Sequence, residues 1–157
     1  MTPAARRVIG SFVLVALAGP LVVDWLWTSD EERVAAALDG MERALEERDA
    51  DALVGWFAVE VEVAAPIPGI PARDPLAEGL RAALSRAAFV ALDRDDTRIE
   101  FTGEGGATVA TSGIAAIEVD GFRVPLRFEL RLRLRDAEDG RFRLEAIESV
   151  AIRPALG

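Results

Sequence analysis

Residues 122–134 read FRVPLRFELRLRL, and this stretch decides the fold. Every second residue from Phe122 to Leu134 is apolar, and most of the residues between them are charged. Alternation with a period of two is typical of a β-strand with one buried face and one solvated face. Such a strand is typical of an antiparallel sheet that covers a core on one side only.

The segments on either side of this strand continue the sheet. Asp120-Gly121 precedes it and Asp139-Gly140 follows it, and both dipeptides are strong signals for hairpin turns. Residues 107–119 are apolar with many small side chains, and residues 142–152 resume the alternation. The second half of the chain is therefore predicted to fold as consecutive antiparallel strands.

A further strand is expected before residue 103. Ile99 and Phe101 alternate with Glu100, and the glycines of residues 103–106 turn the chain. The charged stretch 93–96 predicts a turn that separates this strand from the helix before it.

The first half of the soluble part has the periodicity of helices. Ser29 and Glu32 have the spacing of a capping box, which satisfies free amide groups in the first turn of a helix. Residues with spacings of four, three and four then form one apolar stripe: Val34, Leu38, Met41 and Leu45. Asp49 is expected to cap a second, shorter helix, which carries Leu53, Val54, Trp56 and Phe57.

A short strand and a third helix complete this half. Residues 59–63 alternate Val with Glu, whereas residues 65–75 contain four prolines and predict an extended loop. Ile67 and Ile70 in this loop are expected either to pack or to act as a lid, and packing is the preferred interpretation. Asp74 and Pro75 can begin a third helix. Helices followed by strands predict an α+β fold, with N-terminal helices on one face of a curved, mainly antiparallel sheet.

The N-terminal segment predicts a membrane anchor. Arg6 and Arg7 precede the uncharged residues 8–23, and a helix over residues 8–27 is about 30 Å long, enough to cross a hydrocarbon core. Trp25 and Trp27 then fall in the interfacial belt. The positive-inside rule predicts a cytoplasmic N-terminus and a periplasmic or extracellular domain. The expected division is residues 1–28 as stub and anchor, and residues 29–157 as soluble domain.

Two other interpretations of this segment remain. Ala16-Leu17-Ala18 matches a signal-peptide cleavage site, and cleavage there predicts a secreted protein. A buried core helix is less favoured, because a soluble helix normally shows a polar face.

The composition excludes several functions. The net charge is −9, all 18 basic residues are Arg, and there is no His, Cys, Tyr, Lys, Asn or Gln. An acidic protein lacks the basic surface that nucleic acids require. Without His and Cys, the commonest metal ligands are missing, and no loop has the spacing of a carboxylate metal site. We expect no cofactor and no metal.

The order of elements resembles the nuclear transport factor 2-like superfamily, whose cone-shaped fold includes polyketide-cyclase-like and ketosteroid-isomerase-like proteins. The resemblance rests on three features: the first helix running into residues 48–53, then Trp56-Phe57, and the closing strands joined by residues 139–142. It implies isomerase, dehydratase, hydrolase or cyclase activity, or an assembly role. The His and Tyr residues that those enzymes use are missing here.

One carboxylate is a candidate base. Counting alternate residues from Phe142 places Glu148 on the apolar face, where an isolated carboxylate has a raised pKa. A β-bulge near Ile147 would turn Glu148 outward instead, and this interpretation is preferred.

Four arginines follow the polar face of residues 122–134: Arg123, Arg127, Arg131 and Arg133. They are expected to form cross-strand ion pairs on a solvated face, a protein interface or an anion site, in that order of preference.

The sequence thus favours a membrane-tethered, non-catalytic domain. Membrane lipid is its expected partner through the anchor, and a protein or a second copy is the expected partner of the domain. The alternative is a small-molecule-binding or enzymatic domain that uses the interior of the cone.

Overall fold

The computed structural model describes residues 29–71 and 75–155. The chain divides into two compact units, Met1–Glu32 and Arg33–Gly157. The described elements are, in chain order, α2 (Asp30–Glu46), α3 (Ala50–Val54), β1 (Phe57–Val63), α4 (Leu76–Arg86), β2 (Ala87–Thr102), β3 (Gly106–Val119), β4 (Phe122–Asp136) and β5 (Phe142–Pro154). This order confirms the predicted α+β class.

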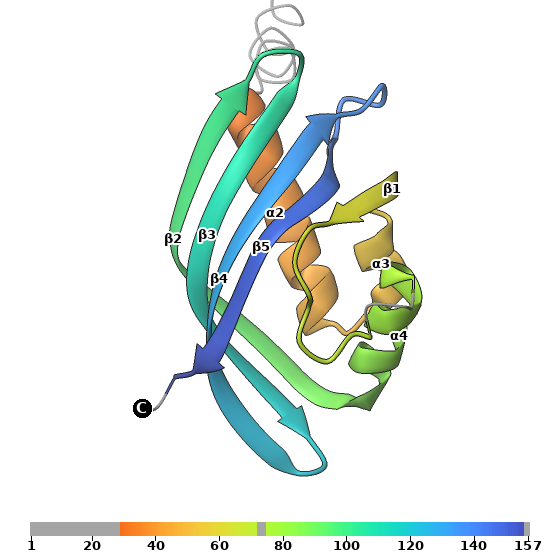
Figure 1. Cartoon of the computed structure of the whole chain (residues 1–157), viewed down its shortest axis with the longest axis vertical. Helices are drawn as coiled ribbons and strands as arrows, with labels where there is room; N and C mark the ends of the chain where they lie inside the picture. The colour runs from red at the N-terminus through yellow and green to blue at the C-terminus, as the bar shows by residue number, and fades with distance from the viewer. Residues whose placement is uncertain (1–28, 72–74, 156–157) are drawn as a thin grey trace, which may run out of the picture. The chain divides into compact units, whose positions relative to one another are not determined.

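The strands form one mixed sheet in the order β1-β5-β4-β3-β2. Strands β2 to β5 are antiparallel to their neighbours, and β1 joins the edge of β5 in parallel. The sheet curves, and α2 lies along one of its faces (Figure 1). We call the face that packs on α2 the inner face and the opposite face the outer face.

The core lies between α2 and the inner face. Leu134 on β4 and Val109 on β3 are fully buried, as is Val34 on α2. They belong to one hydrophobic cluster, which continues through Leu38 and Met41 of α2. The alternation in residues 122–134 therefore separates core from solvent, because successive side chains on a strand point to opposite faces.

Local signals set the start of the first two helices. The amide of Ser29 donates to Glu32 at 2.9 Å and the amide of Glu32 donates to the Ser29 hydroxyl at 3.2 Å, as the capping box predicts. Asp49 accepts from the amide of Ala52 at the start of α3.

The second helix is shorter than the sequence predicts. It ends at Val54, and Phe57 already belongs to β1. Trp56 lies against Gly40 of α2, where an added Cβ would collide with the indole ring. The predicted apolar helix face was wrong here because Trp56 and Phe57 pack from a turn and a strand.

The predicted turn at residues 93–96 was also wrong. Strand β2 continues through it, with Asp93 opposite Ile114 and Asp96 opposite Ser112. A register shift between Arg94 and Asp96 marks a β-bulge, and bulges let a strand bend without leaving the sheet. Gly113 allows this close approach, because a Cβ there would collide with the β2 backbone.

The remaining turns follow the sequence signals. Asp120 and Gly121 have φ values of 53° and 80°, the left-handed conformations that a two-residue hairpin turn requires. In the proline loop, Ile67 packs against the core and Ile70 packs on Gly79 of α4. The proposed cap Asp74 lies outside the described residues.

Candidate functional site

The inner face carries an apolar surface beyond the helices. In Figure 1 the Asp120–Gly121 end of the β3–β4 hairpin extends past them. On this stretch Phe122 is 75% exposed and Val124 is 45% exposed. We call the following side chains the open inner patch: Ile117, Val119, Phe122, Val124, Leu126 and Ile152.

Strand register shows that the open inner patch is one surface. Ile117 lies opposite Val124 and Val119 lies opposite Phe122, while Ile152 lies opposite the core residue Phe128. Directly opposite residues share a face of the sheet. Continuous exposed apolar surfaces are typical of interaction sites.

A pair of hydroxyl groups lies on the same face. Thr111 is the one buried polar residue in the part of the chain that the structure describes, at 7% exposure. Its hydroxyl donates to the carbonyl of Asp96 at 3.1 Å and lies 3.1 Å from the hydroxyl of Thr97. Across the sheet, Thr111 is followed by Leu130 and then Val150, both half-buried. The Thr111 hydroxyl is therefore satisfied within the sheet, several residues along β3 from Ile117 and Val119.

The candidate base Glu148 lies on the outer face. Arg131 pairs with Ser149 and Leu132 pairs with Ile147, so Glu148 is the extra residue of a β-bulge. An earlier register shift, between Leu144 and Ala146, turns Ile147 inward, where it is 8% exposed, and Glu148 points to the arginines of the outer face. Counting alternate residues failed here because the register with β4 shifts twice, leaving Glu145 and then Glu148 as extra residues. The first shift reverses the faces, and the second returns Val150 and Ile152 to the inner face.

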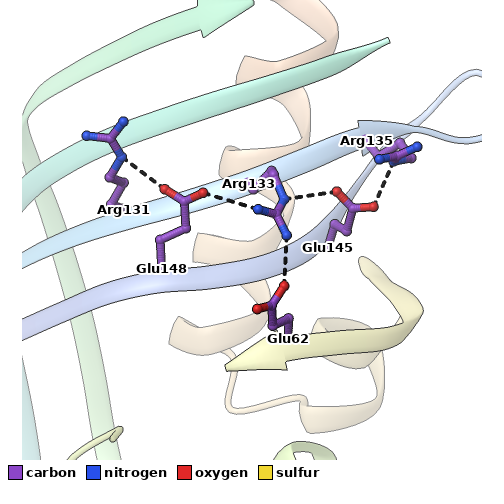
Figure 2. A network of polar contacts seen from close by, with 6 residues as sticks. All are labelled: Glu62, Arg131, Arg133, Arg135, Glu145 and Glu148. Carbon is purple, nitrogen blue, oxygen red and sulfur yellow. Dashed lines mark hydrogen bonds and ion pairs between the residues drawn. The ribbon is translucent and has the colours of Figure 1, made fainter. Parts of the chain in front are cut away.

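Glu148 belongs to a network of six charged side chains (Figure 2). It accepts from Nε of Arg131 at 3.0 Å and from Arg133 at 3.4 Å. Arg133 also donates to Glu145 at 3.1 Å and to Glu62 at 2.9 Å. Arg135 completes the network through Glu145 at 2.7 Å.

This network stabilises charges and leaves no isolated base. The hydrogen bonds to Glu62 and then Glu145 raise the pKa of Arg133 above its ordinary value. Glu148 has two cationic partners, Arg131 and Arg133. Glu62 joins the network from β1, a partner that sequence spacing does not indicate because β1 and β4 are 71 residues apart at this contact.

The other two predicted interface arginines are placed differently. Arg123 lies 3.7 Å from Glu118 and 4.0 Å above the ring of Phe89. Arg127 lies opposite the exposed Ile114 and has no ion pair with any residue in the described ranges. The four arginines therefore do not form one anion site, because three of them already bind carboxylates.

The predicted anchor residues Arg6, Arg7, Trp25 and Trp27 lie outside the described residues. Among residues 29–71 and 75–155, none of the helices has the length and hydropathy needed to cross a bilayer. Within the same ranges, no group of acidic side chains is arranged to hold a metal ion.

Comparison with known proteins gives similarity in structure only. No protein-family model and no curated protein matches the sequence. A proposed dehydratase of the nuclear transport factor 2-like family from Streptomyces avermitilis has a TM-score of 0.64 at 17% identity, covering 82% of this chain and 97% of its own. A proposed aromatic ring hydroxylase from Novosphingobium aromaticivorans has a TM-score of 0.63 at 15% identity. The match covers 81% of this chain and 91% of the hydroxylase chain.

A proposed ketosteroid isomerase from Shewanella frigidimarina has a TM-score of 0.61 at 15% identity, covering 76% of this chain and 95% of its own. At these identities the matches establish a common fold. The chain therefore has the α+β fold of nuclear transport factor 2-like proteins, as the order of its elements predicted. Fold alone does not assign an activity.

Proposed function

We propose that residues 29–157 form a small-molecule-binding domain that holds an apolar ligand against the open inner patch. The observation that carries the proposal is the exposure of Phe122, Val124 and Ile152 on the face that otherwise forms the core. A ligand that covers exposed apolar side chains removes them from water, and this lowers the free energy of the system.

The two faces of the sheet differ in a way that supports this choice. The outer face around Arg133 is occupied by ion pairs. The inner face instead offers the apolar side chains of the open inner patch. Mainly apolar surfaces with few polar contacts are typical of small-molecule sites. The fold shared with proteins described as a dehydratase, a ring hydroxylase and an isomerase also favours a small-molecule role.

The proposal assigns binding and no chemical step. The chain has no His, Tyr or Cys, so the usual bases, nucleophiles and phenolic donors are missing. Glu148, a candidate base for which the outward-facing interpretation was preferred, is paired with arginines on the outer face.

A neutral apolar fluorophore such as Nile red tests the binding surface. We expect Phe122→Ser combined with Val124→Ser to weaken its binding to the full-length chain at least about fivefold, because two apolar contacts are lost. The matched control is Phe89→Ser combined with Ile114→Ser, since both of these residues are exposed apolar side chains on the outer face. Equal weakening by the two pairs, or none by either, would contradict the proposal.

The location of the domain remains part of the proposal. Residues 1–28 are proposed to tether it to a membrane, with residues 29–157 on the periplasmic or extracellular side. Membrane fractionation of the full-length chain, followed by extraction with carbonate, tests the tether. An intact chain in the pellet is expected, and a shortened soluble product would instead indicate signal cleavage.

A second candidate function is contact with a protein or a second copy through the outer face. One observation favours it: exposed Ile114 lies opposite Arg127, which has no ion pair in the described chain. Apolar and arginine side chains side by side are common at interfaces. Arg127→Glu should then lower the apparent mass in sedimentation, and an unchanged mass would count against self-association.

A further inference from the structure

A groove of about 360 Å³ crosses β3 on the outer face, away from the open inner patch. Its floor is made by Ala110 and Ser112 of β3, whose short side chains leave space between the longer ones on either side. Ser149 of β5 also lines it. This groove lies beside the network of Figure 2, which it meets at Arg131.

The strand register arranges four charged side chains around this floor. Asp96 and Glu129 lie on either side of Ser112, and all three line the groove. Two residues further along, Arg98 and Arg131 lie on either side of Ala110. The acidic row and the basic row are thus about 7 Å apart along the strand, at about 3.4 Å per residue.

The protein leaves most of these charges without partners. The side chains of Asp96, Arg98 and Glu129 make no hydrogen bond or ion pair with residues 29–71 or 75–155. Arg131 contacts Glu148 through Nε, and no hydrogen bond of its two terminal nitrogens is found within the same ranges. Elsewhere on this face the arginines at 123, 133 and 135 are paired with carboxylates, whereas Arg127 and Arg153, which lie opposite each other, have no ion pair within the described ranges. The groove therefore brings unpaired charges of both signs together on the outer face.

From this geometry we infer a binding site for a small zwitterion whose opposite charges are about 7 Å apart. The cationic end lies between Asp96 and Glu129, and the anionic end lies between Arg98 and Arg131. The ligand chain crosses the floor at Ala110 and Ser112. Like charges face each other across β3 at about 10 Å, twice the spacing of neighbouring strands, so each row has room for one group of opposite charge. Charge-assisted hydrogen bonds at both ends hold the ligand.

Calorimetry at low salt with ε-aminocaproate tests this site, because its ammonium and carboxylate groups are at opposite ends of a flexible chain. Caproate and hexylamine each carry one of the two charges, and glycine carries both with too short a separation. We expect ε-aminocaproate to bind the full-length chain at least about tenfold more tightly than any of the three, because only it satisfies both rows. Binding should weaken as salt screens these exposed charges.

Two kinds of variant separate this site from a general surface effect. Arg98→Gln and Asp96→Asn each remove one end of the site and should weaken binding at least about fivefold. Ala110→Leu keeps every charge but fills the floor, and it should abolish binding. Arg153→Gln is the matched control, because Arg153 lies on the outer face opposite Arg127 and does not line the groove.

Three results would overturn the inference. The first is equal binding of ε-aminocaproate and the singly charged compounds, which would indicate attraction to the surface only. The second is native affinity in Ala110→Leu. The third is equal weakening in Arg98→Gln and Arg153→Gln. Circular dichroism of each variant confirms folding, and the two charge-neutralising variants keep the test decisive if Ala110→Leu does not fold. Failure here leaves the proposed inner-face function unaffected, since the two sites lie on opposite faces.

Discussion

Arg133 on β4 binds Glu62 on β1 at 2.9 Å, although β5 lies between these two strands. Only Phe57, Glu62 and Val63 of β1 have a registered partner on β5, and the register shifts between Phe57 and Glu62. The Arg133 side chain therefore reinforces an edge strand with an irregular ladder, as the dashed contacts in Figure 2 show.

This relationship predicts a stability that depends on salt. Arg133→Met should lower the urea midpoint at low ionic strength, because Glu62, Glu145 and Glu148 lose a shared cation. The difference from native protein should narrow in about 1 M salt, where the screening length falls to about 3 Å. Arg127→Met is the control, since Arg127 makes no ion pair in the described chain. An equal drop in the urea midpoint of both variants would show that the packing of the arginine stem, and not its charge, stabilises the protein.

Gly40→Ala should destabilise the protein. A helical Gly→Ala change ordinarily adds about 1 kcal/mol through helix propensity. Here the new Cβ would collide with the ring of Trp56, and overpacking of this kind costs about 1–3 kcal/mol. We expect a lower melting temperature together with a changed Trp fluorescence spectrum. Gly103→Ala is the control, because its Cβ would meet no atom within 4 Å.

Shortening an apolar side chain to Ala should cost different amounts of stability at the two ends of β4. Leu134 is fully buried, and Leu134→Ala should cost about 2–5 kcal/mol of unfolding free energy. Val124 lies on the same face but is 45% exposed in the open inner patch, so Val124→Ala should cost less than about 1 kcal/mol. Urea unfolding measures both. Similar losses would mean that the patch is covered in the free protein.

The Asp139 carboxyl in the β4–β5 turn should make the stability of the folded protein depend on pH. Hydrogen bonds from the Arg143 guanidinium at 2.7 Å, and then from the amide of Arg141 at 3.2 Å, hold the pKa of Asp139 below its ordinary value. Because the folded pKa is the lower one, the stabilisation is present above the ordinary pKa of about 3.9 and is lost as pH falls through the folded value.

The corresponding variant is Asp139→Asn. It should be less stable than native protein at neutral pH, and the difference should shrink as the pH is lowered below about 4. Glu138→Gln, at the exposed neighbouring position, should leave the pH profile unchanged. A constant difference at all pH values would assign the effect to turn geometry. Titration of the Asp139 carboxyl by NMR gives the pKa directly.

The sequence by itself determined the helices, most of the strands and the direction in which they face. Ser29 and Glu32 cap α2, and Asp120 with Gly121 turns a hairpin, because these effects depend on residues that are neighbours in the chain. The apolar residues of β4 face the core for the same reason, since alternation is a local property of an extended backbone.

Only the tertiary structure decided which side chains from different strands lie together on each face. The register shift between Leu144 and Ala146 turns Glu148 to the arginines, and the bulge beside Arg94 carries β2 through a stretch that looked like a turn. Bulges depend on how two strands match in length and curvature, which neither strand encodes alone. The groove at Ser112 likewise exists because the register aligns three strands that are distant in the sequence. Contacts across a sheet depend on register between segments, and periodicity within one segment does not contain that information.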